Sequence, residues 1–336
     1  MRSFIEGTPK AELHLHLEGT LEPELKFRLA SRNEVALPYA TVEEMRAAYD
    51  FDDLPSFLAV YYEGMSVLLT EEDFFDLAFT YFQKAHSQNV IYAEVFFDPQ
   101  AHTSRGVAFD TVIRGIRRAQ AQAAEELGIQ TQLIMCFLRD MSAESAMETL
   151  EAADAYRDWI VGVGLDSDEK DNPPNKFASV FAAARERGYQ VTAHCDVDQE
   201  DSIANLWQCL NEIGVDRIDH GVNSLDDPDL VSEIRRRGLG LTMCPISNSY
   251  VTDGYKATEI RRLLELGLLV CINSDDPAYF PGYMTENLAA AQEAAELSRS
   301  HVEQLVRNAF EIAWLDEQAR DSFLSRLDEY LSEHSA

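Results

Sequence analysis

The chain has 336 residues, of which 46% are hydrophobic, so it can bury a sizeable core. It carries 59 acidic and 28 basic residues, a net charge of -31, and such a surface repels nucleic acid and anionic lipid. No long apolar run or N-terminal apolar segment is found, and the five cysteines lack CxxC spacing. We therefore expect a cytoplasmic protein that binds neither nucleic acid nor membranes, without a disulfide framework.

Eight short apolar runs, each ending in a polar tip, recur along the chain with helical segments between them. The runs cover residues 11–18, 90–98, 129–138, 160–167, 189–196, 216–221, 239–247 and 268–276. Two of the helical segments end at Gly188 and Gly238, as expected for a helix C-cap before a strand. Eight alternating units predict one α/β domain over residues 1–336, a (β/α)8 TIM barrel. No G-x-G-x-x-G turn occurs, which disfavours a Rossmann fold.

The segment between the first two runs is too long for a single crossover. It has the pattern of three helices, at about 41–50, 54–68 and 70–89. We expect a helical insertion of about residues 38–88 that lies over the C-terminal mouth of the barrel, where ligands bind. Three further helical patterns after residue 284 predict extra C-terminal helices that pack outside the barrel.

Three histidines and one aspartate are placed where strand tips meet. His14 and His16 alternate in the first run, so both project to one side. His194 ends the fifth run and Asp275 ends the eighth. Because all four side chains point to the same mouth, they predict a shell for one zinc ion per chain, with a position left for water. Imidazole favours zinc over magnesium, and iron or manganese stay open.

His220 ends the sixth run, one strand beyond His194. That position suits a base or an electrostatic clamp beside a metal-activated water. The alternative is a core histidine bonded to Asp219. The remaining histidines are expected to lie outside the site; they are His86, His102, His301 and His334.

Five motifs now carry a resemblance. "HLHLEG", "HCDVD", "RIDHG", "CPISN" and "NSDDP", in this order, resemble the adenosine/adenine deaminase family of the amidohydrolase superfamily, from about Ala11 to the helices after Asn287. The resemblance implies a mononuclear zinc site on a TIM barrel. It also implies hydrolytic loss of the amine at carbon 6 of a purine, a small-molecule substrate.

Matched residue by residue, the resemblance assigns the zinc ligands to the four residues named above. They are His14, His16, His194 and Asp275. It makes His220 the histidine beside the attacking water, so that His220 and Asp275 are both catalytic. Asp276 matches the acid that hydrogen-bonds purine nitrogen 7, and Ser167 matches the loop residue whose backbone meets nitrogen 3.

Two features resemble the adenine branch more than the nucleoside branch. Adenosine deaminases typically have "HLDG", whose aspartate binds ribose, whereas Glu18 stands here; the second strand ends "EVFFDPQ" and not "EVRFSP". A longer Glu18 is expected to occupy space that the sugar needs. The resemblance therefore implies deamination of adenine to hypoxanthine and ammonia. Adenosine and an N6-substituted, cytokinin-type adenine remain alternatives.

One departure concerns the proton donor. The family usually has "HAGE" after the zinc histidine, but Val197 stands in place of that glutamate. We expect Asp198 to take the role, with Asp196 and Glu200 as second choices. The change also leaves open a catalytically impaired protein that binds metal and purine.

A pyrimidine or pterin deaminase is a further alternative, because "HCD" also resembles the cytosine deaminase motif. Asp98, Arg139 and Asp219 are expected to lie outside the site. The sequence leaves the oligomeric state open, including a homo-oligomer.

Overall fold

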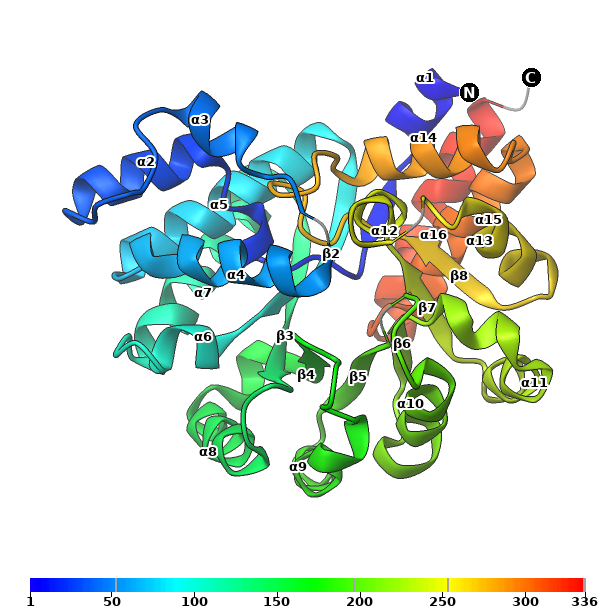
Figure 1. The fold of residues 1–336 in the computed structure, drawn as a ribbon. Coiled ribbons are helices and arrows are strands. Elements are labelled where there is room, and N and C mark those ends of the chain that lie inside the picture. The colour runs from blue at the N-terminus through cyan, green and yellow to red at the C-terminus, as the bar shows by residue number, and fades with distance from the viewer. Residues whose placement is uncertain (52, 196, 253, 335–336) are drawn as a thin grey trace.

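The computed structural model describes residues 1–334 except 52, 196 and 253. Eight parallel strands follow one another around a barrel in chain order, with helices outside them (Figure 1). The strands are β1 Lys10–Glu12, β2 Val90–Phe97, β3 Gln130–Leu138, β4 Ile160–Asp166, β5 Gln190–Cys195, β6 Arg217–His220, β7 Gly240–Met243 and β8 Leu269–Ile272. This confirms the predicted (β/α)8 architecture.

The barrel closes through residues that follow β1, not through β1 itself. The first predicted strand, 11–18, is shorter than expected, since β1 ends at Glu12 and a 3₁₀ turn begins at Glu18. The extended chain between them pairs with both neighbouring strands. His16 donates its backbone N–H to the Asp275 carbonyl at 3.0 Å, and Asp275 donates to the His14 carbonyl at 3.1 Å. The alternation of His14 and His16 therefore persists beyond the named strand.

Helices cover the outside of the barrel between successive strands. They are α5 Glu71–Ser87, α7 Phe109–Glu126, α8 Ala143–Ala153, α9 Ala178–Glu186, α10 Ser202–Gln208, α11 Pro228–Arg237, α13 Ala257–Glu265 and α15 Arg299–Ile312. Local sequence sets their ends: Asp227 caps the first turn of α11, and Gly238 ends it at φ 67°. Gly188 takes φ 82° after α9, as predicted.

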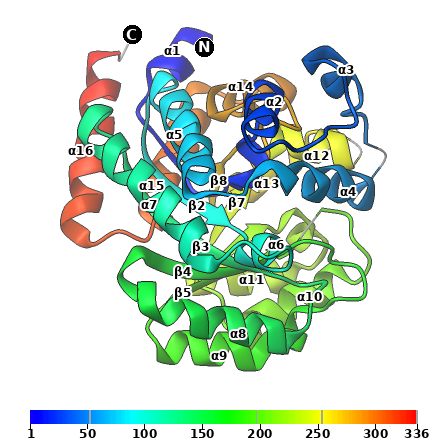
Figure 2. The ribbon, with the colours of Figure 1, turned by 90° about the vertical axis from the view of Figure 1, so that its left-hand side faces the viewer.

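Part of the insertion covers the mouth of the barrel. The helices of this part are α3 Val42–Ala47 and α4 Leu54–Gly64, and α4 lies near α12 Pro245–Val251 at one end of the molecule (Figure 2). Helix α2, Pro23–Arg32, precedes the insertion. The third predicted helix, α5, instead packs on β2 and α7 as an ordinary outer helix. Within the described residues, the mouth-covering segment therefore ends with α4 and the short turn after it.

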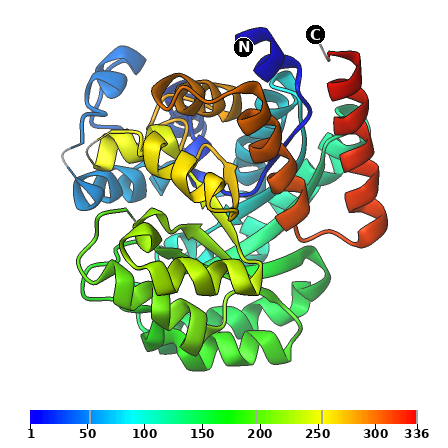
Figure 3. The ribbon, with the colours of Figure 1, turned by 90° about the vertical axis from the view of Figure 1, so that its right-hand side faces the viewer.

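The remaining helices flank the barrel. They are α1 Arg2–Gly7, α6 Pro99–Thr103, α14 Met284–Ala294 and α16 Glu317–Glu333. The chain ends lie together, because the Tyr330 hydroxyl donates to the Phe4 carbonyl at 3.0 Å, and α16 runs along the side away from the mouth helices (Figure 3). Among the described helices, none combines the length and apolarity that a bilayer span requires.

Candidate active site

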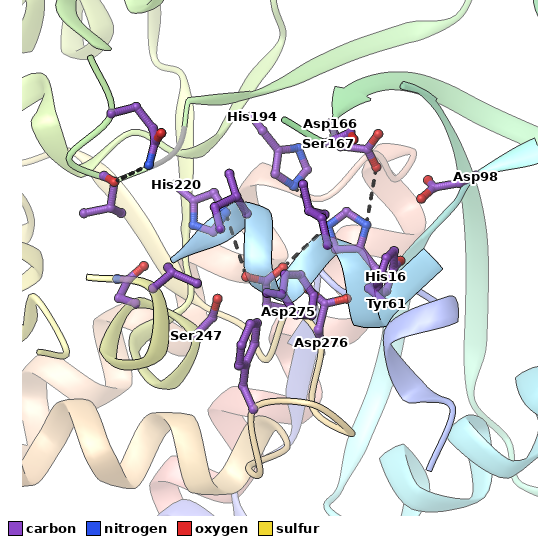
Figure 4. Close-up of a pocket in the computed structure, with 18 of the residues that line it drawn as sticks. His16, Tyr61, Asp98, Asp166, Ser167, His194, His220, Ser247, Asp275 and Asp276 are labelled. Carbon is purple, nitrogen blue, oxygen red and sulfur yellow. Dashed lines mark hydrogen bonds and ion pairs between the residues drawn. The ribbon is translucent and has the colours of Figure 1, made fainter. Parts of the chain in front are cut away.

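Four ligand atoms, from His14, His16, His194 and Asp275, converge at the mouth of the barrel. Figure 4 shows three of these residues, His16, His194 and Asp275. The Nε2 atom of His194 lies 3.1 Å from Nε2 of both His14 and His16. Asp275 Oδ1 lies 3.2 Å from His14 Nε2 and 3.5 Å from His16 Nε2. All four residues are buried. The structure thus brings together the whole set that the strand tips predicted.

The far sides of the His14 and His194 rings are each held by an acceptor. Thr242 donates its hydroxyl to Asp219 at 2.9 Å, so it accepts a hydrogen bond from His14 Nδ1 at 2.8 Å. His194 Nδ1 donates to the Leu165 carbonyl at 3.0 Å. With the proton on Nδ1, each Nε2 carries a lone pair directed at the other rings. Such outer partners commonly fix the orientation of metal-binding histidines.

This arrangement fits a tetrahedral metal ion. Bonds of 2.0–2.1 Å to a central zinc place neighbouring ligand atoms about 3.3–3.4 Å apart. The spacings of 3.1–3.5 Å match that edge length. Lone pairs this close repel one another unless a cation lies between them. The donor set of three imidazoles and one carboxylate suits zinc, and also iron or other first-row metals.

Burial sets the charge states that metal ligands need. It lowers the pKa of His16 to about 4 and that of His194 well below its usual range, so both rings are neutral at neutral pH. Burial raises the pKa of Asp275, but the surrounding histidines, His14 first, outweigh it and hold that pKa well below its usual range. Asp275 is therefore ionised.

His220 lies beside the four ligands without being one of them. Its ring centroid is 4.6 Å from that of His14, and its Nε2 is 3.9 Å from Asp275 Oδ2. Burial and the neighbouring His14 lower its pKa to about 4, which leaves a neutral imidazole. His220, Asp275 and Ser167 all adopt positive φ, at 59°, 65° and 75°. Strained backbone of this kind concentrates at functional sites.

Asp276 lines the cavity next to Asp275. Burial, followed by the charge of Asp275, raises its pKa well above the usual range, so its carboxyl holds a proton. Its Oδ1 atom meets no hydrogen-bond partner within the described residues. A neutral buried carboxyl can donate a hydrogen bond to a ligand nitrogen.

The cavity above the four ligands is largely apolar on one side and acidic on the other. Its apolar lining comes from Leu54, Phe57, Leu58, Tyr61, Tyr62, Val197, Val251 and Phe280. The Tyr62 hydroxyl donates to Ser167 Oγ at 2.7 Å, which ties α4 to the end of β4. Ser167 itself lines the cavity. Helix α4 therefore covers this side of the cavity.

The loop after His194 places its acids away from the cavity. Val197 and Gln199 line the cavity, whereas Asp198 has a side chain that is 45% exposed and forms an ion pair of 2.5 Å with Lys256. The Asp198 backbone, at φ 57°, accounts for this direction. Glu200 is exposed. Asp196 lies outside the described residues. The predicted donor, Asp198, is thus not brought into the cavity.

Glu18 is buried behind the cavity and is absent from the residues that form its wall. Its Oε1 accepts hydrogen bonds from His102 Nε2 at 2.7 Å and from the Asp98 backbone N–H at 3.2 Å. His102 was expected to lie outside the site, because a lone histidine in a helical context gives no sign of a partner far away in sequence. Glu18 and His102 form a buried pair beneath Asp98.

Two acids of the wall, Asp98 and Asp166, were missed or excluded in the sequence analysis. Arg139, also excluded, lies behind the ligands and donates to the His194 carbonyl at 2.9 Å. The signal for Asp98 and Asp166 was their position at the ends of the second and fourth runs, the same position that identified His194 and Asp275.

Comparisons with known proteins agree with this geometry. Residues 9–330 match the family model described as adenosine deaminase. An adenine deaminase of Hahella chejuensis is 49% identical over 99% of this chain and 100% of its own. Another adenine deaminase, from Acinetobacter baylyi, is 47% identical over 97% of this chain and 98% of its own.

Two solved structures are also similar. The adenine deaminase of Arthrobacter aurescens superposes with a TM-score of 0.94 at 41% identity, covering 97% of this chain and 100% of that one. An amidohydrolase from Burkholderia ambifaria with bound zinc has a TM-score of 0.87 at 26% identity, covering 99% and 94%. Fold and site thus define a barrel hydrolase of the amidohydrolase type. The chain belongs to the adenosine deaminase family.

Proposed function

We propose that the protein deaminates free adenine by hydrolysis, giving hypoxanthine and ammonia, with one zinc ion per chain. Membership of the family makes it a hydrolytic deaminase. The observation that carries the proposal is the cluster of four ligand atoms, with four contacts of 3.1–3.5 Å among them, beside His220 and Asp276 in a cavity with an apolar lining. Relatives named adenine deaminase, 45–51% identical over nearly the whole chain, support adenine as the substrate.

His14, His16, His194 and Asp275 are the residues that would hold the ion. When bound there, zinc supplies hydroxide as a nucleophile at neutral pH by lowering the pKa of its water. His220, neutral and close to Asp275, is placed to accept a hydrogen bond from this nucleophile and to hold it over carbon 6. One water is consumed, and the amine leaves as ammonia.

Asp276 and Ser167 would fix the purine ring. The neutral carboxyl of Asp276 donates a hydrogen bond to nitrogen 7 and so draws electron density from the ring. The Ser167 backbone at the end of β4 meets nitrogen 3, and its side chain is tied to the lid by Tyr62. Glu18 supports this wall from behind through the Asp98 backbone.

The apolar lid would cover the ring. Phe57, Leu58 and Tyr61 of α4 line the cavity opposite the acids, so a flat aromatic ring packs against them while water is excluded. Val197 adds an apolar surface where the family usually places its glutamate. An apolar surface there also suits an N6-alkylated adenine, which stays the second candidate substrate.

Asp198 is paired with Lys256 outside the cavity, so the proposal gives it no role in protonating the ring. A shift of this loop is needed before Asp198 reaches a substrate.

The test is reconstitution. Metal-free protein is loaded with one equivalent of zinc, and hypoxanthine and ammonia formed from adenine are measured, with His194→Ala as the blank. We expect stoichiometric zinc and turnover in the wild type, and loss of both in the variant. Zinc binding without turnover of any 6-aminopurine would instead support the catalytically impaired binding protein.

The proposal also covers the binding partners of the protein and its location in the cytoplasm. The net charge of -31 supports a protein that binds small molecules and neither nucleic acid nor anionic membranes. Five free, buried cysteines suit the reducing cytoplasm. Filter binding with DNA and RNA, vesicle sedimentation and cell fractionation test these points, and light scattering tests whether the chain forms a homo-oligomer.

A further inference from the structure

Asp98 is a buried acid that none of the roles above uses. It ends the turn after β2, is 1% exposed and lines the cavity. Its Oδ1 atom meets no hydrogen-bond partner within the described part of the chain. An unpaired carboxyl oxygen in such a place costs free energy unless a ligand supplies a donor.

Asp166, at the end of β4, faces Asp98 across the wall. Ligand atoms of Asp98, Asp166 and His16 all lie within 4.8 Å of one another. Both Asp166 oxygens are buried and also lack a hydrogen-bond partner among the described residues. Asp98 Oδ1 is therefore open to a donor that a ligand in the cavity supplies. Figure 4 shows Asp98 and Asp166 on the same side of the cavity.

The ring of His16 lies between this acid pair and the ligand cluster. Its Nε2 atom belongs to the cluster, 3.1 Å from His194 Nε2, while its Nδ1 lies 3.4 Å from Asp166 Oδ2. The acid pair is therefore separated from the ligand cluster by the width of one imidazole ring. In a purine with carbon 6 at the cluster, the five-membered ring lies at a similar distance from the cluster as the acid pair does.

A free 6-aminopurine has one ring N–H, and this group is on its imidazole ring. A nucleoside has a sugar on that nitrogen and no N–H. Asp98 is an acceptor that only the free base can satisfy. We propose that Asp98, supported by Asp166, accepts a hydrogen bond from the imidazole N–H of the purine base and thereby selects bases over nucleosides. This inference rests on the proposed function, since it assumes that carbon 6 lies at the ligand cluster.

In the alternative explanation, Asp98 and Asp166 have a structural role only. Asp166 Oδ2 lies 3.4 Å from His16 Nδ1, in the place where outer partners of metal ligands commonly lie. Asp98 makes no such contact with a ligand residue that would account for its oxygen. If Asp98 were only structural, the protein itself would supply a donor to its buried oxygen, and replacing Asp98 would affect all substrates equally.

The test compares adenine with 9-methyladenine, which keeps the purine ring but has no N–H at the position of the sugar. Zinc-loaded wild type, Asp98→Leu and Asp98→Ser are measured, with Ser145→Ala as the matched control. Ser145 bonds Gln100 of α6 at 2.8 Å without lining the cavity. Leu keeps the shape of Asp98 and removes the acceptor, and Ser is the residue of the "EVRFSP" type.

We expect the wild type to prefer adenine over 9-methyladenine. Removing the acceptor should lower kcat/KM for adenine about 10- to 100-fold and change that for 9-methyladenine by less than about threefold. Equal losses on both substrates, or no loss on adenine, in variants with unchanged Tm and zinc content would overturn the proposal. If Asp98→Leu does not fold, Asp98→Ser gives the same comparison.

Calorimetry separates this inference from the proposed function. Purine and 9-methylpurine, which have no amine to lose, are titrated into the wild type and both variants. Wild-type preference for purine that disappears in the variants supports Asp98 as the selecting residue even if adenine is not turned over. An equal affinity for both ligands in the wild type contradicts it, whatever the activity.

Discussion

Gly19 and Asp276 pack so closely that a side chain on Gly19 has no room. A Cβ atom built on Gly19 lies 2.0 Å from Asp276 Oδ1 and 2.8 Å from its Cα. The glycine of "HLEG" is therefore needed by a residue more than 250 positions away, and the backbone of one wall sets the position of the acid on the other.

We predict that Gly19→Ala displaces Asp276 and lowers kcat/KM for adenine at least about 100-fold, because a shift of about 1 Å at a site can cost that much. The variant should still be folded at the assay temperature, as its Tm shows, so that the loss of kcat/KM is not a loss of folded protein. Gly128→Ala is the control: its Cβ meets open space at φ 68°, so it lowers stability slightly and leaves activity intact. Full activity of Gly19→Ala would contradict the role given to Asp276.

Asp198→Asn tests the loop acid. Because Asp198 is half-exposed and paired with Lys256, we expect kcat/KM within about threefold of the wild type, since an exposed ion pair contributes little. Lys256→Met should behave in the same way. A loss of about 100-fold or more in Asp198→Asn alone, the size expected for a missing general acid, would restore the role predicted from the sequence.

Tyr62→Phe tests the connection between lid and barrel. The variant keeps the ring and loses the 2.7 Å hydrogen bond to Ser167. We expect KM for adenine to rise about three- to tenfold with kcat almost unchanged, because the closed lid contributes to binding more than to chemistry. Tyr330→Phe, which loses a hydroxyl contact with Phe4 near the chain ends, should leave both constants as they are. A fall in kcat at constant KM would argue against this reading.

A buried lysine makes stability depend on pH. Lys10 donates to the carbonyls of Thr8 and Gln88, both at 2.8 Å, and burial lowers its pKa from 10.5 to about 7. Between these values the unfolded chain binds more protons than the folded one, so this group makes stability rise with pH, by at most about 1.4 kcal/mol per pH unit.

The measurement is urea unfolding of the wild type and of Lys10→Met from pH 7.5 to 9.5. We expect the free energy of unfolding of the wild type to rise relative to that of the variant over this window. A constant difference between the two would show that the amine titrates at its ordinary pKa.

Much of the ligand set followed from the sequence because of one physical rule. The ends of parallel strands meet at one mouth, so His194 and Asp275 at strand tips had to approach the HLH pair. Alternation held for His14 and His16 even beyond the end of β1, since that chain is extended and paired on both sides.

Other parts of the site depend on contacts that one sequence does not reveal. The direction of Asp198 follows from one backbone angle and from Lys256, far along the chain. The pair of Glu18 and His102 joins the first strand tip to a helix after β2. The proximity of Asp98 to Asp166 depends on how the barrel places the ends of β2 and β4, which the sequence alone does not show. The amphipathic pattern of α5 is the same for a helix over the mouth and for an outer helix, so the sequence did not distinguish these two placements.

The central claim is that the zinc-loaded protein deaminates the free base. The decisive measurement is kcat/KM for adenine, adenosine and N6-isopentenyladenine. Each reaction is monitored by the ultraviolet change that accompanies loss of the amine. We predict turnover of adenine, with adenosine at least about 100-fold poorer and no turnover by His194→Ala. Equal or better turnover of adenosine, or an inactive protein that holds its zinc, would contradict it.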